Sequence, residues 1–594
     1  MKTSRYTHNM LPVSIILAFS AILAFSNTLC NDFVYDDSAY VVNNHHIRDF
    51  SHFLSYFTSL HTYQSTGAEG QFKVYRPLVT ASFALDYAIW KLNPFGYHLT
   101  NLILHYITSI LIYIFFCTLL KHRIQAFITA IIFLIHPVQV EAVAWISGRG
   151  NMLYAILSIL SLTAFLRYLT LPDKKSIIHA LIWYTMALFA KETAVAVLPL
   201  MILIFLFSSD HTHLKLKFKK LLILLVPFFI VTAIYTIIRT AVIDAVSQRE
   251  LWGGSYSATV ATMVKVALLY LYKLVLPVKL NVLQNISVIP SLLSINATLF
   301  STALLVIAYF CGIRKNTSST VKFGFWWILL ALLPVSNIIP LQALFAERFL
   351  YLSVAGFGCI VAYIFFYVAV RKKAILATCL IIVSLNIKTI SRNSEWQSND
   401  TLWKSVLAVD PQNAKAYNGI GMAYLEKNDL DNAATALQKA IRYAPDNLYI
   451  TNNLALVFLK QGNKDEALRL FEKTLKMEGN QAVSYHNLGL LYLEQKRYSE
   501  ALFYLEKTVE LDKRYANAYN SLGMCYFYMG EHEKAISAWL TSASVRPDDP
   551  QSYYNIIISY LQKNDFDNAN LFLRKAIKIF PEHPSFEEIK RKLR

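Results

Sequence analysis

The stretch that decides the fold of this chain is HLTNLILHYITSILIYIFFCTLL-KHR-IQAFITAIIFLIHPVQV, residues 98–140. Two apolar runs, 98–120 and 124–140, are joined by the short basic cluster Lys121-His122-Arg123. An apolar helix of about 20 residues is long enough to cross about 30 Å of hydrocarbon. Basic residues in a short loop between two such helices are typical of the cytoplasmic side of a membrane. The stretch therefore predicts a helical protein that passes back and forth through a membrane.

The composition of the whole chain agrees with this prediction. Of 594 residues, 55% are hydrophobic and 16% are charged, and the mean hydropathy is +0.39. A soluble globular chain carries about 25% charged residues, and a disordered chain needs low hydrophobicity. Six cysteines are too few for a disulfide scaffold of this length. The net charge of +18 would suggest nucleic acid in a soluble protein, but much of the excess lies in clusters between apolar runs, so we expect no nucleic-acid partner.

Apolar runs recur as far as residue 392. We expect spans at 11–30, 98–120, 124–140, 151–171, 177–190, 193–208, 221–242, 293–313, 323–340, 349–370 and 374–391. The basic clusters are Lys121 to Arg123, Lys174-Lys175, Lys215 to Lys220, Arg314-Lys315 and Arg371 to Lys373. Placing all of them inside predicts eleven crossings, with the N-terminus in the cytoplasm and the C-terminal part outside. A crossing by 259–276 would break this order, so that run is expected to be re-entrant or interfacial, stopped by Pro277.

The C-terminal part is a repeat array, because one residue type recurs at a fixed spacing. The alanines that lie 34 residues apart are Ala433, Ala467, Ala501, Ala535 and Ala569. A second phase holds the small residues Gly421, Ala455, Gly489 and Gly523. This period is the tetratricopeptide repeat (TPR) pattern, in which small residues lie where two helices touch. We therefore predict an all-α protein: a membrane helical bundle over 1–392, a connector over 393–412, and a solenoid of five TPRs over 413–594.

Several charged motifs converge on the predicted outer face. The first outer loop contains Asp36-Asp37, and adjacent carboxylates can act as a general base or hold a metal. Four basic residues follow in later outer segments: Arg76, Arg149, Lys191 and Arg348. Ionisable residues beside apolar helices are costly and are functional by default, and arginine suits a phosphate. The alternatives left open are a helix cap or solvated loop for the acids, and interfacial snorkelling for each cation.

The order of these motifs resembles the transmembrane-and-TPR (TMTC) proteins, which are in turn similar to the GT-C glycosyltransferases and the protein O-mannosyltransferases. The matching segments are 33–39, 75–78, 92–98, 101–105, 136–143, Gly148-Arg149, Lys191-Glu192, 347–351 and the junction 396–413. The resemblance implies transfer of a sugar, mannose or another hexose, from a polyprenyl-phosphate donor outside the cytoplasm. It spans nearly the whole chain, with five recognisable repeats, fewer than in many relatives.

The resemblance also implies roles for individual residues. Asp36 and Asp37 match the catalytic acids of the first outer loop; Asp37 is our first choice for the base, Asp36 for positioning, and together they are the place for a divalent metal, should one be used. The residues expected to bind the donor phosphate are Arg76, Lys191, Arg348 and Arg149. Those expected to orient these groups are His98, His136, Glu141, Glu192 and Glu347. A single base near the acceptor suffices for an inverting displacement, whereas retention usually needs a carboxylate nucleophile.

Three functions remain open at this stage. The first is transfer of a lipid-linked sugar to Ser or Thr hydroxyls of protein, and the second is transfer to a lipid or glycan. The third is a non-catalytic membrane scaffold that binds partners through its TPRs. The TPR groove is expected to hold the acceptor chain through Asn418, Asn452, Asn453, Asn487, Asn520 and Asn555. The alternative is that these asparagines only follow the repeat consensus. A multi-pass protein of a bacterial inner membrane is favoured over one of the endoplasmic reticulum.

Overall fold

The computed structural model covers the whole chain in two compact units, one that extends to Val409 and one that begins at Asp410. The residues that it describes are 10–48, 50, 53–59, 74–208, 214–243, 251–341, 343–367, 371–477, 481–547, 549–580 and 583–592. Within these ranges the regular elements are all helices. The side chains of the expected basic clusters at 215–218 and 371–373 lie outside the described set.

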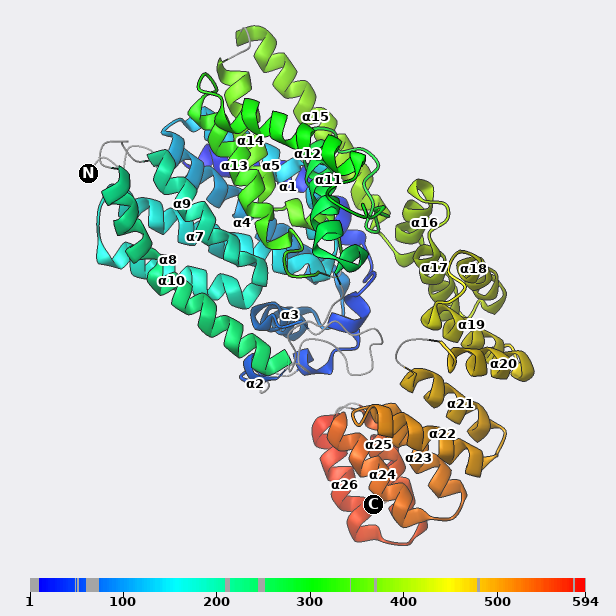
Figure 1. Ribbon diagram of the computed structural model, residues 1–594. Coiled ribbons are helices and arrows are strands. Elements are labelled where there is room, and N and C mark those ends of the chain that lie inside the picture. The colour runs from blue at the N-terminus through cyan, green and yellow to red at the C-terminus, as the bar shows by residue number, and fades with distance from the viewer. Residues whose placement is uncertain are drawn as a thin grey trace. The chain divides into compact units, whose positions relative to one another are not determined.

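The first unit is a bundle of long helices (Figure 1). Its principal helices are α1 Met10–Phe25, α3 Pro77–Trp90, α4 Pro94–Leu120, α5 Arg123–Ile135, α7 Gly150–Thr170, α8 Lys174–Ala190, α9 Val197–Ser208, α10 Leu214–Ile243, α11 Tyr256–Val275, α12 Ile295–Ala308, α13 Ser319–Leu332, α14 Ser353–Tyr367, α15 Arg371–Glu395 and α16 Asn399–Val409. Short helices α2 Ser55–Thr58 and α6 Val140–Ala144 lie between them. Each of the expected spans overlaps one of these helices.

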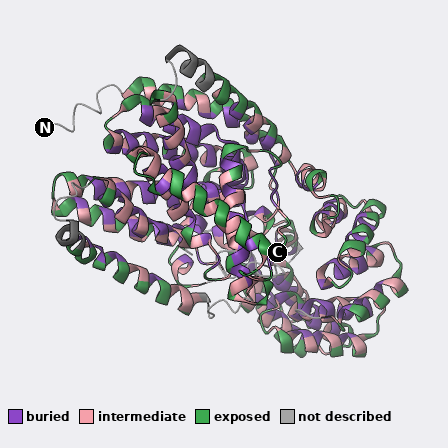
Figure 2. Cartoon of the chain, turned by 45° about the horizontal axis from the view of Figure 1, so that its top comes forward, coloured by how far each residue is buried: buried purple, intermediate pink, exposed green. Residues whose placement is uncertain are grey.

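The described residues contain six helices long and apolar enough to cross a membrane, or seven if one bent pair counts as a single span. Shorter apolar helices run over Glu192–Ser208, Ser319–Val335 and Ser353–Tyr367. Large apolar side chains remain exposed on the outer helices, among them Ile237 of α10 and Leu305 of α12, with exposed fractions of 67% and 69%. Figure 2 shows the buried residues gathered inside the helical bundle. An apolar outer surface of this kind is expected where helices face lipid.

Two segments differ from the simplest helical expectation. The span expected at 124–140 is broken after Ile135, and the chain bends there by 53° before α6. Pro137 explains the break, because proline has no backbone N–H to continue the helical ladder. The run expected to be re-entrant or interfacial instead forms an unbroken helix, α11, which ends just before Pro277 and is itself long enough to span. The re-entrant alternative is therefore not seen.

The second unit consists of paired antiparallel helices that repeat along the chain. They are α17 Ala414–Glu426 with α18 Leu430–Tyr443, α19 Leu448–Lys460 with α20 Lys464–Thr474, α21 Ala482–Glu494 with α22 Tyr498–Leu511, α23 Ala516–Tyr528 with α24 His532–Val545, α25 Pro550–Gln562 with α26 Phe566–Ile579, and a last helix α27 Pro584–Lys592. The expected five repeats are these five pairs.

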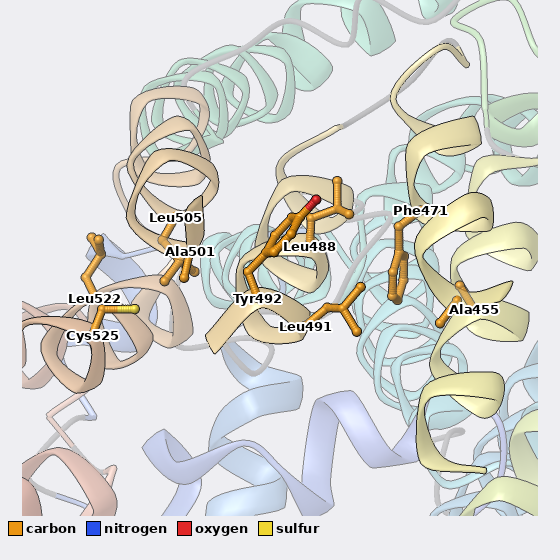
Figure 3. Close-up of a cluster of buried hydrophobic side chains, with 10 residues drawn as sticks. Ala455, Phe471, Leu488, Leu491, Tyr492, Ala501, Leu505, Leu522 and Cys525 are labelled. Atoms are coloured by element: carbon orange, nitrogen blue, oxygen red, sulfur yellow. The ribbon is translucent and has the colours of Figure 1, made fainter. Parts of the chain in front are cut away.

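Small residues permit the close contact within several of the pairs. A Cβ added at Gly489 would lie 2.6 Å from Cγ of Leu505, and one at Gly523 would lie 2.4 Å from Nε1 of Trp539. The 34-residue alanines at 433, 467, 501, 535 and 569 are all fully buried. Figure 3 shows Leu488 and Leu505 among the buried apolar side chains of neighbouring repeats. The repeat spacing in the sequence is thus a consequence of helix packing.

The asparagines expected to line the groove are largely paired with other side chains. Asn453 donates to Asn418 at 2.9 Å, and Asn555 donates to Asn520 at the same distance. Asn452 is buried and donates to the hydroxyl of Ser484. These amides therefore form hydrogen bonds between successive repeats. The sequence had not indicated this structural role.

Candidate active site

The acidic pair lies in a tight turn just after α1 and the short helix Ser26–Cys30. The Asp37 N–H donates to the Val34 carbonyl at 3.1 Å, which places Tyr35 and Asp36 at the two central positions of the turn. Tyr35 has a φ of 59°, in the left-handed region. This conformation costs a non-glycine residue roughly 1–3 kcal/mol and persists only where the surroundings impose it. The backbone at the turn is therefore held in place by other parts of the protein.

Asp37 is locked by hydrogen bonds. It is fully buried; its Oδ1 accepts from the Ser147 backbone N–H at 2.8 Å and from the Ser147 hydroxyl at 2.5 Å. Its Oδ2 accepts from the Val34 N–H at 3.1 Å. Burial raises the pKa of Asp37 to about 7, and the hydrogen bonds from Ser147 and Val34 oppose the rise. Both oxygens are thus committed to fixing the loop against the segment that contains Ser147.

Asp36 is in a different position. Its side chain is partly exposed, and within the described residues it has no hydrogen-bond or ion-pair partner. Burial raises the pKa of Asp36 to about 6, and the nearby positive charge of Arg348 opposes the rise. A free carboxylate whose pKa lies close to neutral pH is well matched to proton transfer.

Arg348 is oriented by a buried glutamate. Its guanidinium forms an ion pair with Glu141, and its backbone N–H donates to Glu141 Oε2 at 2.9 Å. The guanidinium also lies 5.2 Å from the ring centroid of Trp145. The Arg348 side chain remains 23% exposed, whereas that of Glu141 is fully buried. Glu141 thus holds the Arg348 guanidinium in place, and part of the guanidinium remains accessible.

A second ion pair joins Arg76 and Glu192, and its charges act on Lys191, as do those of Arg348 and Glu141. Arg76 forms a two-point ion pair with Glu192, with Nε–Oε2 and Nη2–Oε1 distances of 3.1 and 2.7 Å. The Lys191 amine donates to Asn151 Oδ1 at 2.5 Å. Burial and the charges of Arg76 and Arg348 lower the pKa of Lys191 well below its ordinary value. Three basic side chains and two glutamates therefore form one cluster.

Arg149, expected to bind donor phosphate, lies in a buried structural network instead. Its side chain has no exposed area and forms an ion pair with Asp86 at 2.5 Å. It also donates to Asn101 Oδ1 at 2.8 Å and to the Tyr97 carbonyl at 3.0 Å. A guanidinium with its donors committed in this way joins α3 to α4 and offers little to a ligand.

Three of the residues expected to orient the site contact other parts of the protein, away from Asp36. His136 accepts from the Val138 N–H and its other ring nitrogen lies 2.9 Å from the Leu274 carbonyl, so it joins the bend after α5 to α11. Glu347 is fully buried and pairs with Arg392 at 3.3 Å. His98 is buried in α4 beside the backbone of the first outer loop. The structure brings none of the three next to Asp36 by a direct contact.

The structure also reveals residues that the sequence interpretation missed. Tyr35 packs between Trp145 and Trp403, with ring centroids 5.6 and 5.5 Å away. The Tyr35 N–H donates to Asn399 Oδ1 at 2.8 Å. Nothing in the local sequence signals these contacts, because their partners are more than a hundred residues away.

The acidic pair offers a poor metal site. Within the described residues, no group of three or more His, Cys, Asp or Glu side chains is placed to hold an ion. Asp37 already uses both carboxylate oxygens for hydrogen bonds to Ser147 and Val34. Asp36 alone is left as a free oxygen donor, so the pair does not fit a two-carboxylate metal site.

A polytopic helical bundle with an acidic loop, a cation cluster and a TPR solenoid defines a class of membrane protein that has known relatives. The tetratricopeptide repeat family matches residues 421–462, 447–514, 486–544 and 521–584. A protein O-mannosyl-transferase of Caenorhabditis elegans is 26% identical over 68% of this chain and 59% of its own length. Protein O-mannosyl-transferase TMTC3 of Homo sapiens is 26% identical over 72% of this chain and 50% of its own length. Protein O-mannosyl-transferase TMTC4 of Homo sapiens is 24% identical over 70% of this chain and 64% of its own length.

The chain is similar to the TMTC protein O-mannosyl-transferases over about 70% of its length and contains tetratricopeptide repeats. It spans between half and two thirds of the length of these curated relatives.

Proposed function

We propose that this protein is a membrane glycosyltransferase that moves a mannosyl or other hexosyl group from a polyprenyl-phosphate donor to a hydroxyl of an acceptor protein. The observation that carries the proposal is the partly exposed carboxylate of Asp36 beside the oriented guanidinium of Arg348. Such a pair places a base near a group that can bind the phosphate. The similarity to the O-mannosyl-transferases supports mannose as the sugar and a protein as the acceptor.

The geometry favours Asp36 as the base and Asp37 as the positioning residue, the reverse of the order preferred from the sequence. A general base must reach the proton that it removes, and Asp36 has a free carboxylate while Asp37 has none. With its pKa raised to about 6, Asp36 is largely ionised at pH 7 and is more basic than an ordinary aspartate. Asp37 fixes the turn that presents it.

The proposed reaction is a single displacement at C1 of the sugar. The acceptor oxygen forms a bond to C1 while the bond from C1 to the phosphate oxygen breaks. The hydroxyl proton passes to the Asp36 carboxylate, and the electron pair leaves with the polyprenyl phosphate. One carboxylate suffices for this step, and attack from the opposite side inverts the anomeric configuration.

The cation cluster would stabilise the leaving phosphate. Arg348 and Arg76 retain 23% and 21% exposed side chain and are held by glutamates, so their guanidinium groups are oriented before the donor binds. Preorganised cations aimed at developing negative charge are usually a large part of catalysis. Lys191 is nearly buried, and we assign it to the electrostatic field of the cluster. Arg149 is left out, because its donors are committed to Asp86 and Asn101.

We also place the site on the extracytoplasmic side, with eleven crossings and an outside TPR unit. α11 is long enough to be a further span, but a crossing there would put Arg314 and Lys315 outside, so we leave it out of the count. The support is the distribution of basic clusters along the chain and the helices that overlap every expected span. A cysteine introduced at Ser537 on the TPR unit should then react with an impermeant reagent in intact cells. Labelling that requires permeabilisation would contradict this topology.

Purified full-length protein in liposomes with mannosyl-phosphoryl polyprenol tests the enzymatic proposal. The expected result is release of polyprenyl phosphate together with mannosylation of a Ser/Thr-rich acceptor protein, both abolished by Asp36→Asn. Donor turnover with transfer to a lipid or glycan alone would replace the protein acceptor in the proposal. The absence of any turnover above the Asp36→Asn background would refute the proposal and leave the scaffold function.

A further inference from the structure

The helix that precedes the TPRs contacts the turn that contains Asp36. α16 runs from Asn399 to Val409 and belongs to the same compact unit as the membrane helices. Asn399 accepts the Tyr35 N–H at 2.8 Å, and Trp403 packs against the Tyr35 ring. Two residues before Asn399, the Gln397 carbonyl accepts the Asp32 N–H at 2.9 Å. The segment between α15 and the repeats thus binds the acidic loop at three points.

We infer that Asn399 is a positioning residue for the proposed base: by accepting the Tyr35 N–H it holds the left-handed turn that directs the Asp36 carboxylate toward the acceptor. The inference rests on the proposed function of Asp36. It assigns part of the active site to the connector, which the sequence suggested only as a link between two domains.

The conformation of Tyr35 is what makes Asn399 necessary. Glycine is the usual residue at a turn position with positive φ, because it has no Cβ to clash. Tyrosine at φ 59° stays there only if its surroundings outweigh the strain. The hydrogen bond from its N–H to Asn399 fixes the peptide plane directly before Tyr35. Without it, the residue can relax to a negative φ and rotate the Asp36 backbone that follows.

Asn399 acts at the loop, whereas its neighbours stabilise α16 itself. At the start of α16, Thr401 Oγ1 accepts the Ser398 N–H at 2.9 Å, and the Ser398 hydroxyl accepts the Thr401 N–H at 3.3 Å. These bonds cap the helix and do not touch Tyr35. Thr401→Ala is therefore a matched control, because it weakens the same helix end and leaves the Asn399–Tyr35 bond intact.

The test is steady-state glycosyl transfer by full-length variants in liposomes. Asn399→Ala should lower kcat about 10- to 100-fold, the loss that follows a misplaced reacting group, with little change in KM for the donor. Thr401→Ala should keep the wild-type kcat. Wild-type kcat in Asn399→Ala, or an equal loss in Thr401→Ala, would overturn the inference.

Two further variants keep the test decisive if Asn399→Ala does not accumulate in the membrane. Asn399→Asp retains the acceptor oxygen but adds a negative charge beside the loop, so kcat should return at high pH while the acidic limb of the pH profile moves upward. An acidic limb at the wild-type pH would contradict the position of residue 399 beside the acidic loop. In a Tyr35→Gly background, where positive φ carries no strain, Asn399→Ala should cost much less than in the wild type; an undiminished loss would refute the role of the turn.

The same assay separates this inference from the proposed function. If wild-type protein and Asp36→Asn are equally inactive, the proposed function fails. If the wild type is active, Asp36→Asn is not, and the Asn399 variants have the wild-type kcat, only the positioning role fails.

Discussion

Exchange of each acid of the outer loop for its amide should separate a chemical role from a structural one. Asp37 is fully buried and accepts three hydrogen bonds, two from Ser147 and one from the Val34 N–H. In Asp37→Asn, the amide oxygen can replace only one carboxylate oxygen, and the NH₂ group then faces a backbone N–H. A buried donor without a partner costs about 1–3 kcal/mol. Asp37→Asn should therefore lower the thermal unfolding temperature of the protein.

Asp36→Asn should have the opposite pattern. Within the described residues the Asp36 carboxylate has no hydrogen-bond partner to lose, so the unfolding temperature should not change. Loss of the general base should reduce the rate of glycosyl transfer by about 10² to 10⁴. Both variants are compared by differential scanning fluorimetry in detergent and by single-turnover transfer in liposomes. Full activity in Asp36→Asn, or an inactive Asp37→Asn of unchanged thermal stability, would contradict these two roles.

Three further predictions follow from the same contacts. Since Asp36 must be ionised to accept a proton and its pKa is raised to about 6, kcat/KM should fall as the pH drops through about 6; a limb near 4 would contradict the burial of this loop. Arg76→Gln removes the proposed charge-assisted contact to the donor phosphate and should raise the KM for the donor about tenfold or more. The free energy of unfolding should change little, because the Arg76–Glu192 pair is partly exposed. An unchanged KM would show that Arg76 does not bind the phosphate. Gly489→Val forces a side chain to within 2.6 Å of Leu505 and should destabilise the TPR unit by about 1–3 kcal/mol, seen as faster limited proteolysis of the repeats; unaltered proteolysis would contradict the close helix contact.

The fold was largely predictable because its signals are periodic. Apolar runs predicted the helices of the first unit, of which six or seven in the described residues are long and apolar enough to cross a membrane, and a 34-residue recurrence of alanine predicted the repeat array. Pro137 and Pro277 mark a break and a helix end that follow from proline chemistry alone. The sequence did not predict the unbroken helix over 259–276. We expected that run to be re-entrant or interfacial because of the positions of distant basic clusters, and its length alone does not decide whether it crosses the membrane.

The site was predictable only as a collection of charged groups. The sequence presents Arg149 and Arg348 alike, as arginines at the predicted outer face. Arg149 is buried and bound to Asp86 and Asn101. Arg348 is bound to Glu141, and its side chain remains partly exposed. These partners are distant in the chain, so only the fold distinguishes a structural cation from an accessible one.

The same limit applies to the acidic pair. Two adjacent aspartates have the same local sequence, and what separates them is Ser147, 110 residues further on. The left-handed conformation of Tyr35 has no sequence signal either, because tyrosine is not a residue that marks such a turn. Asn399 is linked to it across 364 residues.

The stereochemistry of transfer shows whether Asp36 acts as a single base in one displacement at C1. Full-length protein is incubated with mannosyl-phosphoryl polyprenol of defined anomeric configuration and a Ser/Thr acceptor protein, and the configuration of the product is read by NMR. A single carboxylate base, Asp36, predicts a product with the opposite anomeric configuration to the donor, formed in the wild type and not in Asp36→Asn. A product of retained configuration, or inverted product formed equally well by Asp36→Asn, would show that Asp36 is not the base of a single displacement.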